Sequence, residues 1–93
     1  MVIGLLTLEL HVPGARSLKD KRQALRSLET RLRNRLNVSV AEVEHQELRQ
    51  RARLAVVCVN TDRAHLDAAL SAATSEAGRS RGLEVLAADT EIL

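Results

Sequence analysis

The 93-residue chain contains no phenylalanine, tyrosine or tryptophan, and it has only one cysteine, one proline and four glycines. Leucine, valine and alanine must therefore fill the core, so each layer of the fold is expected to be thin and aliphatic. Because RNA-binding sheets of the common type stack bases on aromatic side chains, recognition of that kind is excluded. Any RNA contact is expected to involve backbone and shape, with little sequence preference.

The single cysteine, Cys58, lies inside the apolar run of residues 54–59 and is expected to be a small buried residue rather than a nucleophile. It cannot form an intrachain disulfide, which favours a reducing compartment. The longest apolar runs are too short to span a bilayer. The N-terminal residues lack the basic region of a signal peptide. The sequence therefore predicts a cytoplasmic protein with no membrane segment.

Hydrophobic patterning divides the chain into six elements. Alternating apolar residues predict strands over residues 2–12, 38–44, 51–60 and 83–92, and helical spacing predicts one helix after Ser17 and another after residues 60–62. A strand–helix–strand–strand–helix–strand order predicts a ferredoxin-like α+β sandwich, with a four-stranded antiparallel sheet and both helices on one face. The length allows one core, so residues 1–93 are expected to form a single domain.

Several local signals set the ends and irregularities of these elements. Ser17 is predicted to cap the first helix, with Asp20 as a capping-box-like partner, and Asn37 is predicted to end it in the left-handed conformation. The alternation in the second strand slips between Val40 and Val43, which predicts a β-bulge. Apolar stripes are expected along the two helices, made by Leu18, Leu25, Leu28, Leu32 and Leu36 and by Leu66, Ala69, Leu70, Ala73 and Ala77.

The net charge is only +2, but the positive charge is concentrated in the first helix. Residues 16–36 include eight basic and two acidic residues, a local charge of +6. On an ideal helix, one side of the leucine stripe carries a basic ridge, interrupted mainly by Glu29 and formed by Lys19, Arg22, Arg26 and Arg33. Arg31 and Arg35 fall on the other flank, and Lys21 falls over the stripe.

Cations arranged in this way suit contact with phosphates. The predicted nucleic-acid contacts are Lys19, Lys21, Arg22, Arg26 and Arg33. In the alternative interpretation, these side chains cover the leucine layer and pair with the protein's own acidic residues.

The outward face of the predicted sheet is unusually apolar. If Glu9 and Arg53 face out, the same face carries Ile3, Leu5, Ala55, Val57 and Val59. Exposed faces of antiparallel sheets are usually polar, so this patch predicts self-association, as a homodimer, or a protein partner. The alternative is a partly covered sheet that tolerates surface valines.

Four segments carry a family resemblance that covers nearly the whole chain. They are IGLLTLELHVP at residues 3–13, SLKDKR at 17–22, LNVSVAEVEHQ at 36–46 and QRARLAVVCV at 50–59. In combination they resemble the YlxP-like family of small bacterial proteins. The resemblance implies a ferredoxin-like fold. The genes of such proteins often lie among those for translation initiation and ribosome-binding factors, which implies a role near ribosome assembly or RNA.

No catalytic or metal-binding pattern is evident in the sequence. The turn that precedes the first helix, with Arg16 and Ser17, is a weak candidate for anion binding. An Arg-bearing first loop together with Asn60 suggests an acylphosphatase-like enzyme as the third hypothesis. The three histidines lack ligand spacing, so no metal and no cofactor are expected. The first hypothesis is a non-enzymatic module that binds RNA or a ribosomal subunit, and the second is a protein-interaction subunit that uses the outer sheet face.

Overall fold

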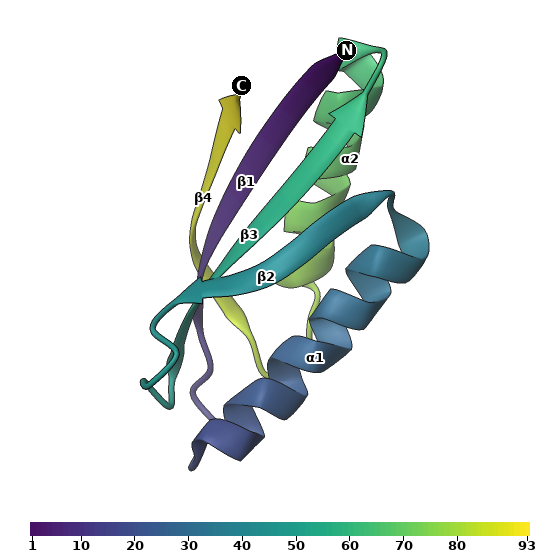
Figure 1. The fold of residues 1–93 in the computed structure, drawn as a ribbon. Coiled ribbons are helices and arrows are strands. Elements are labelled where there is room, and N and C mark those ends of the chain that lie inside the picture. Colours follow the sequence, from purple (N-terminus) through teal and green to yellow (C-terminus); the bar gives the residue numbers. More distant parts are fainter.

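The backbone of the computed structural model, which describes residues 1–93, forms four antiparallel strands and two helices (Figure 1). The strands run in the order β2-β3-β1-β4 across the sheet. In chain order the elements are β1 (Val2–His11), α1 (Leu18–Arg35), β2 (Val38–Glu44), β3 (Arg51–Asn60), α2 (Arg63–Gly78) and β4 (Glu84–Ile92). The predicted ferredoxin-like fold is confirmed. Neither helix combines the length and the hydropathy that crossing a membrane requires.

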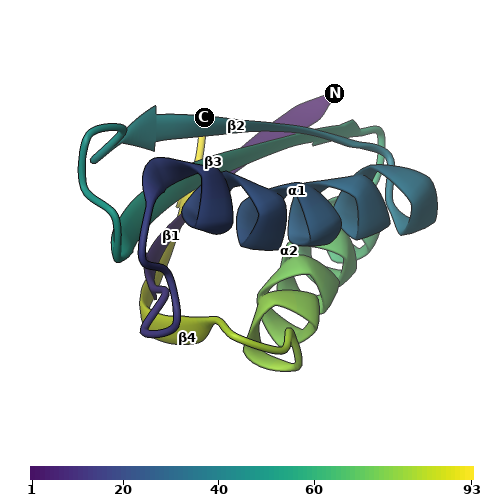
Figure 2. The same ribbon diagram turned by 90° about the horizontal axis from the view of Figure 1, so that it is seen from below.

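An aliphatic core lies between the sheet and the helices, which cover the same face (Figure 2). Even-numbered residues of β1 and β3 point into it, as predicted; Leu8 and Leu54 are opposite one another and fully buried. The helices contribute the buried residues Leu25, Leu28, Leu32, Leu66, Leu70, Ala73 and Ala77. Because the chain has no Phe, Tyr or Trp, the burial of these aliphatic side chains provides most of the hydrophobic stabilisation of the fold.

The predicted cap at the N-terminal end of α1 is confirmed, whereas the predicted cap at its C-terminal end is wrong. The Ser17 hydroxyl accepts a hydrogen bond from the Asp20 N–H at 3.1 Å. The Asp20 carboxylate accepts from the Arg16 N–H rather than from that of Ser17, so the reciprocal bond is displaced by one residue. The prediction for Asn37 is wrong: Leu36 ends the helix in an extended conformation, and His45 is the only non-glycine residue with positive φ.

A bulge in β2 places two neighbouring acidic residues on opposite faces of the sheet. The register of β2 against β3 shifts between Glu42 and Glu44, which confirms the predicted irregularity. Glu42 is opposite Leu54 on the helix-covered face, whereas Glu44 is opposite Arg53 on the outer face. This change of side allows β2 to supply a carboxylate to each of two separate charged clusters.

Candidate nucleic-acid interface

The flank of α1 that faces α2 carries cations that share a carboxylate of the protein as their ion-pair partner. Arg31 Nε lies 2.9 Å from Glu76 Oε1, and Arg35 Nη1 lies 3.1 Å from Glu76 Oε2. Glu76 is 8% exposed, and it also accepts a hydrogen bond from Arg79 at 2.7 Å. Hydrogen bonds from Arg79 and Arg31, with the nearby Arg35 charge, lower the pKa of Glu76 against the opposing effect of burial. Arg31 and Arg35 therefore each have an internal ion-pair partner, although the single Glu76 carboxylate does not cancel the charge of all three arginines.

The cations of the basic ridge on the other flank have no such partner. Lys19, Arg22 and Arg26 are exposed and form no ion pair or hydrogen bond with the protein. Arg33 is also exposed, and its Nη2 donates to the carbonyl of Val40 at 2.7 Å. A carbonyl is a neutral acceptor, so Arg33 keeps its charge while its position is fixed beside β2. The ridge therefore presents to solvent four cations that have no ion-pair partner.

Glu29 is the acidic residue that interrupts this ridge. Its side chain is partly buried and forms no ion pair with its basic neighbours. Burial raises the pKa of Glu29; the charges of Arg33 and Arg26 oppose this rise, and the charge of Glu42 adds to it. Glu29 therefore reduces the positive potential of the ridge without holding its arginines in place.

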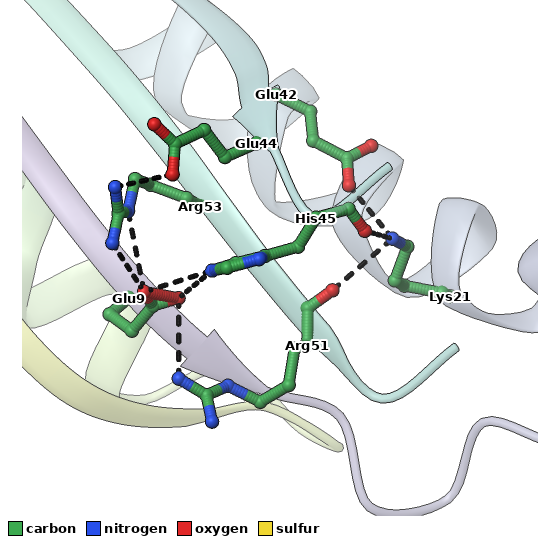
Figure 3. Close-up of polar contacts among 7 residues, drawn as sticks. All are labelled: Glu9, Lys21, Glu42, Glu44, His45, Arg51 and Arg53. Carbon is green, nitrogen blue, oxygen red and sulfur yellow. Dashed lines mark hydrogen bonds and ion pairs between the residues drawn. The ribbon is translucent and has the colours of Figure 1, made fainter. Parts of the chain in front are cut away.

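The prediction that Lys21 contacts nucleic acid is wrong, because this side chain is completely buried. Its Nζ lies 2.9 Å from Glu42 Oε2 and donates to the carbonyl oxygens of His45 at 2.8 Å and Arg51 at 3.2 Å (Figure 3). The helical projection placed Lys21 over the leucine stripe, and the β2–β3 hairpin lies beyond that stripe. The ammonium group therefore joins α1 to the hairpin and is not available to solvent.

A second charged cluster surrounds Glu9 on the outer face (Figure 3). Arg53 Nη2 lies 3.0 Å from Glu9 Oε1, and His45 Nε2 lies 3.2 Å from the same carboxylate. Arg51 Nη2 lies 3.6 Å from Glu9, and Arg53 also pairs with Glu44 at 2.6 Å. Burial alone would raise the pKa of Glu9, but hydrogen bonds from Arg53 and His45 outweigh it and lower the pKa.

Together the two clusters hold the β2–β3 hairpin from both faces of the sheet. His45 takes part in both, since its carbonyl accepts from Lys21 while its ring reaches Glu9. Its left-handed backbone, with φ of 66°, turns the chain at this point. The sequence indicated part of the Glu9 cluster, because Glu9 and Arg53 are both expected to lie on the outward face of the sheet. The position of His45 beside Glu9 depends on the path of the β2–β3 loop, and no pattern in the sequence indicates it.

The turn before α1 satisfies two of its backbone donors with its own side chains. The N–H groups of Arg16 and Asp20 are taken by the side chains of Asp20 and Ser17. The proposed acylphosphatase-like combination of Arg16 with Asn60 is wrong in its geometry. Asn60 is opposite Val2, whereas Arg16 follows the far end of β1, so the two residues lie toward opposite ends of the sheet. Cys58 is buried, as expected, and burial raises the pKa of its thiol.

The apolar outer face has the composition that the sequence predicted. Ile3 is opposite Val59 and Leu5 is opposite Val57, with Ala55 next along β3. Val57 and Val59 are 39% and 48% exposed. On the same face, β4 places Glu91 opposite Leu5 and Asp89 opposite Thr7, so the patch has an acidic border.

Comparison with known proteins shows which family the chain belongs to. A family model described as "Protein of unknown function (DUF503)" matches residues 3–90. The chain belongs to the DUF503 family. A Bacillus subtilis (strain 168) protein described as "Uncharacterized protein YlxP" is 36% identical over 62 residues, which is 67% of each chain. The resemblance to YlxP-like proteins is thus confirmed.

Replacing Lys21 by methionine should destabilise the DUF503 chain strongly. The substitution leaves the Glu42 carboxylate without its partner in a mostly buried site, where breaking an ion pair costs roughly 3–5 kcal/mol. Lys19→Met removes the same charge from an exposed position and should change the free energy of unfolding by no more than about 0.5 kcal/mol. Urea unfolding followed by circular dichroism measures both. Equal effects of the two variants would contradict the structural role of Lys21.

The lowered pKa of Glu9 predicts an acid-sensitive contribution to stability. A carboxyl whose pKa is lower in the folded than in the unfolded chain stabilises the fold above its unfolded pKa, and this contribution is lost as the pH falls through the folded pKa. The stability advantage of the wild type over Glu9→Gln should therefore be largest near neutral pH and shrink below about pH 4.5. Urea unfolding across this range checks it; an advantage that grows on acidification would contradict the Glu9 assignment.

Proposed function

We propose that this chain is a non-enzymatic module that binds RNA, free or within a ribosomal particle, through the basic ridge of α1. The observation that carries the proposal is the division of the cations on α1. Lys21, Arg31 and Arg35 are paired with the protein's own carboxylates, whereas Lys19, Arg22 and Arg26 have no such partner. Uncompensated cations on one face favour a polyanion, because phosphate contacts release condensed counterions.

The chemistry of the ridge supports phosphate as the group that it contacts. Three of its four members are arginines, and a guanidinium group donates to two phosphate oxygens at once in a planar arrangement. The residues next to it on the solvent side of α1 are neutral and exposed, namely Gln23, Ser27, Thr30 and Asn34. A polyanion that approaches this side of the helix therefore meets cations and hydrogen-bonding groups, and Glu29 is the one carboxylate within the ridge.

Reversing the charge of Arg22, Arg26 and Arg33 together to glutamate should abolish binding to structured RNA or to ribosomal subunits. Each reversal replaces an attraction to phosphate by a repulsion, and wild-type binding should weaken steeply as salt is added. Filter binding and subunit co-sedimentation measure the effect. Circular dichroism establishes that the variant is folded, since Arg33 also contacts Val40. Unchanged RNA and subunit binding by the folded variant would rule the proposal out.

Self-association through the outer sheet face is a second candidate function. It is favoured by an apolar face on which Val57 and Val59 are exposed and Ile3, Leu5 and Ala55 are partly exposed. A second copy would remove this apolar area from water. The expected result is a dimeric mass by light scattering at high protein concentration, which Val57→Lys converts to a monomeric mass. A wild-type monomer at the highest concentration reached would remove this candidate.

A further inference from the structure

We infer that the RNA recognised by the basic ridge is double-stranded and is bound along its phosphate backbone and across its shallow minor groove. This inference rests on the proposed function and adds the structural class of the RNA. It follows from three features of the protein: a sheet without Phe, Tyr or Trp on which bases could stack, the fixed spacing of the ridge positions along α1, and the neutral polar side chains beside the ridge.

The sheet of this protein offers single-stranded RNA no surface for stacking bases. The chain has no Phe, Tyr or Trp, and the outward positions of the central strands are occupied by Leu5, Thr7, Ala55 and Val57. On the same face β4 adds Asp89 and Glu91, which repel phosphates. Stacking on aromatic side chains contributes about 1–3 kcal/mol per base in proteins that bind single strands. A single strand bound to this sheet would lose conformational freedom, and base stacking on aromatic side chains would not offset that loss.

The ridge has fixed dimensions because both ends of α1 are held. Ser17 caps its first turn, and the contact of Arg33 with Val40 ties its last turn to β2. At 1.5 Å per residue, Lys19 and Arg33 are separated by about 21 Å along the helix axis. A row of cations on a fixed helix gains most from phosphates that are already fixed in space, since only the side chains of the ridge then have to be ordered on binding. Duplex RNA provides such an array.

The neutral side of α1 favours RNA over DNA in this arrangement. Gln23, Thr30 and Asn34 are exposed beside the ridge and make no hydrogen bond within the protein. An α-helix does not fit the deep, narrow major groove of A-form RNA, but it can lie across the wide minor groove, where the 2′-hydroxyls are displayed. Amide and hydroxyl side chains beside a line of phosphate-binding cations match that surface.

The test compares three fluorescent probes with equal numbers of phosphates: an RNA duplex, an unstructured single-stranded RNA, and a DNA duplex of the same sequence. Anisotropy titrations at several salt concentrations should give an affinity for the RNA duplex about tenfold above that for the single strand, because stacking does not assist the latter. The RNA duplex should also bind more tightly than the DNA duplex. Gln23→Ala combined with Asn34→Ala should reduce that preference for RNA.

The salt dependence identifies the contacts. Four phosphate contacts predict a slope of log affinity against log salt of roughly −3 to −4 for the duplex. Arg26→Gln should make this slope shallower by about 1. The matched control Arg81→Gln removes the same charge from an exposed arginine that is outside α1 and also lacks an ion pair, and it should leave the slope unchanged.

The outcomes separate the inference from the proposed function. Equal or tighter binding of the single strand, or equal binding of the DNA duplex, would overturn the inference and leave a general RNA-binding or nucleic-acid-binding ridge in place. No binding of any probe, together with no binding to ribosomal subunits, would overturn the proposed function itself. An equal loss of slope in Arg26→Gln and Arg81→Gln would show that the contacts are not confined to the ridge.

Discussion

The buried ammonium group of Lys21 fixes how α1 lies on the sheet. It contacts Glu42 of β2 and the carbonyl oxygens of the β2–β3 hairpin, and none of its surface reaches solvent. Rotating the helix about its axis would separate this pair and leave charges unpaired in a weakly polarisable interior, which is costly. Successive residues of a helix are turned by about 100°, so fixing Lys21 also fixes the direction of every other side chain on α1.

Two carboxylates then decide which cations on the helix remain available. Glu42 takes Lys21 on the β2 side, and Glu76 takes Arg31 and Arg35 on the α2 side. The basic ridge is what remains, at the open side of the helix beyond the edge strand β2. Arginines of the same helix thus have two different roles. Some pair with Glu76 and join α1 to α2, whereas others face solvent and contribute positive charge to the surface. By this division, a chain with a net charge of only +2 places a row of cations without ion-pair partners on one face.

Many features of the fold were predictable because they depend on short-range patterns. The period of two in β1 and β3 appears at the expected residues. Leu25, Leu28 and Leu32 of the predicted stripe are buried, and the register slip in β2 lies between Glu42 and Glu44, at the end of the segment in which it was expected. Two predictions were wrong because another element of the fold decides the outcome. Asn37 did not adopt the left-handed conformation because Leu36 leads directly into β2. Lys21 lies over the leucine stripe, but only the hairpin beyond it explains why its charge is buried.

The sequence by itself determined the aliphatic core, the order of the elements, the outward apolar face and the lack of Phe, Tyr and Trp for base stacking, since each follows from composition or from periodicity along the chain. Only the tertiary structure decided which of the eight basic residues between positions 16 and 36 are free. Ion pairing joins residues such as Arg31 and Glu76, which are 45 positions apart, and depends on distances of a few ångströms. Those distances are set by strand register and helix rotation, which no local pattern encodes.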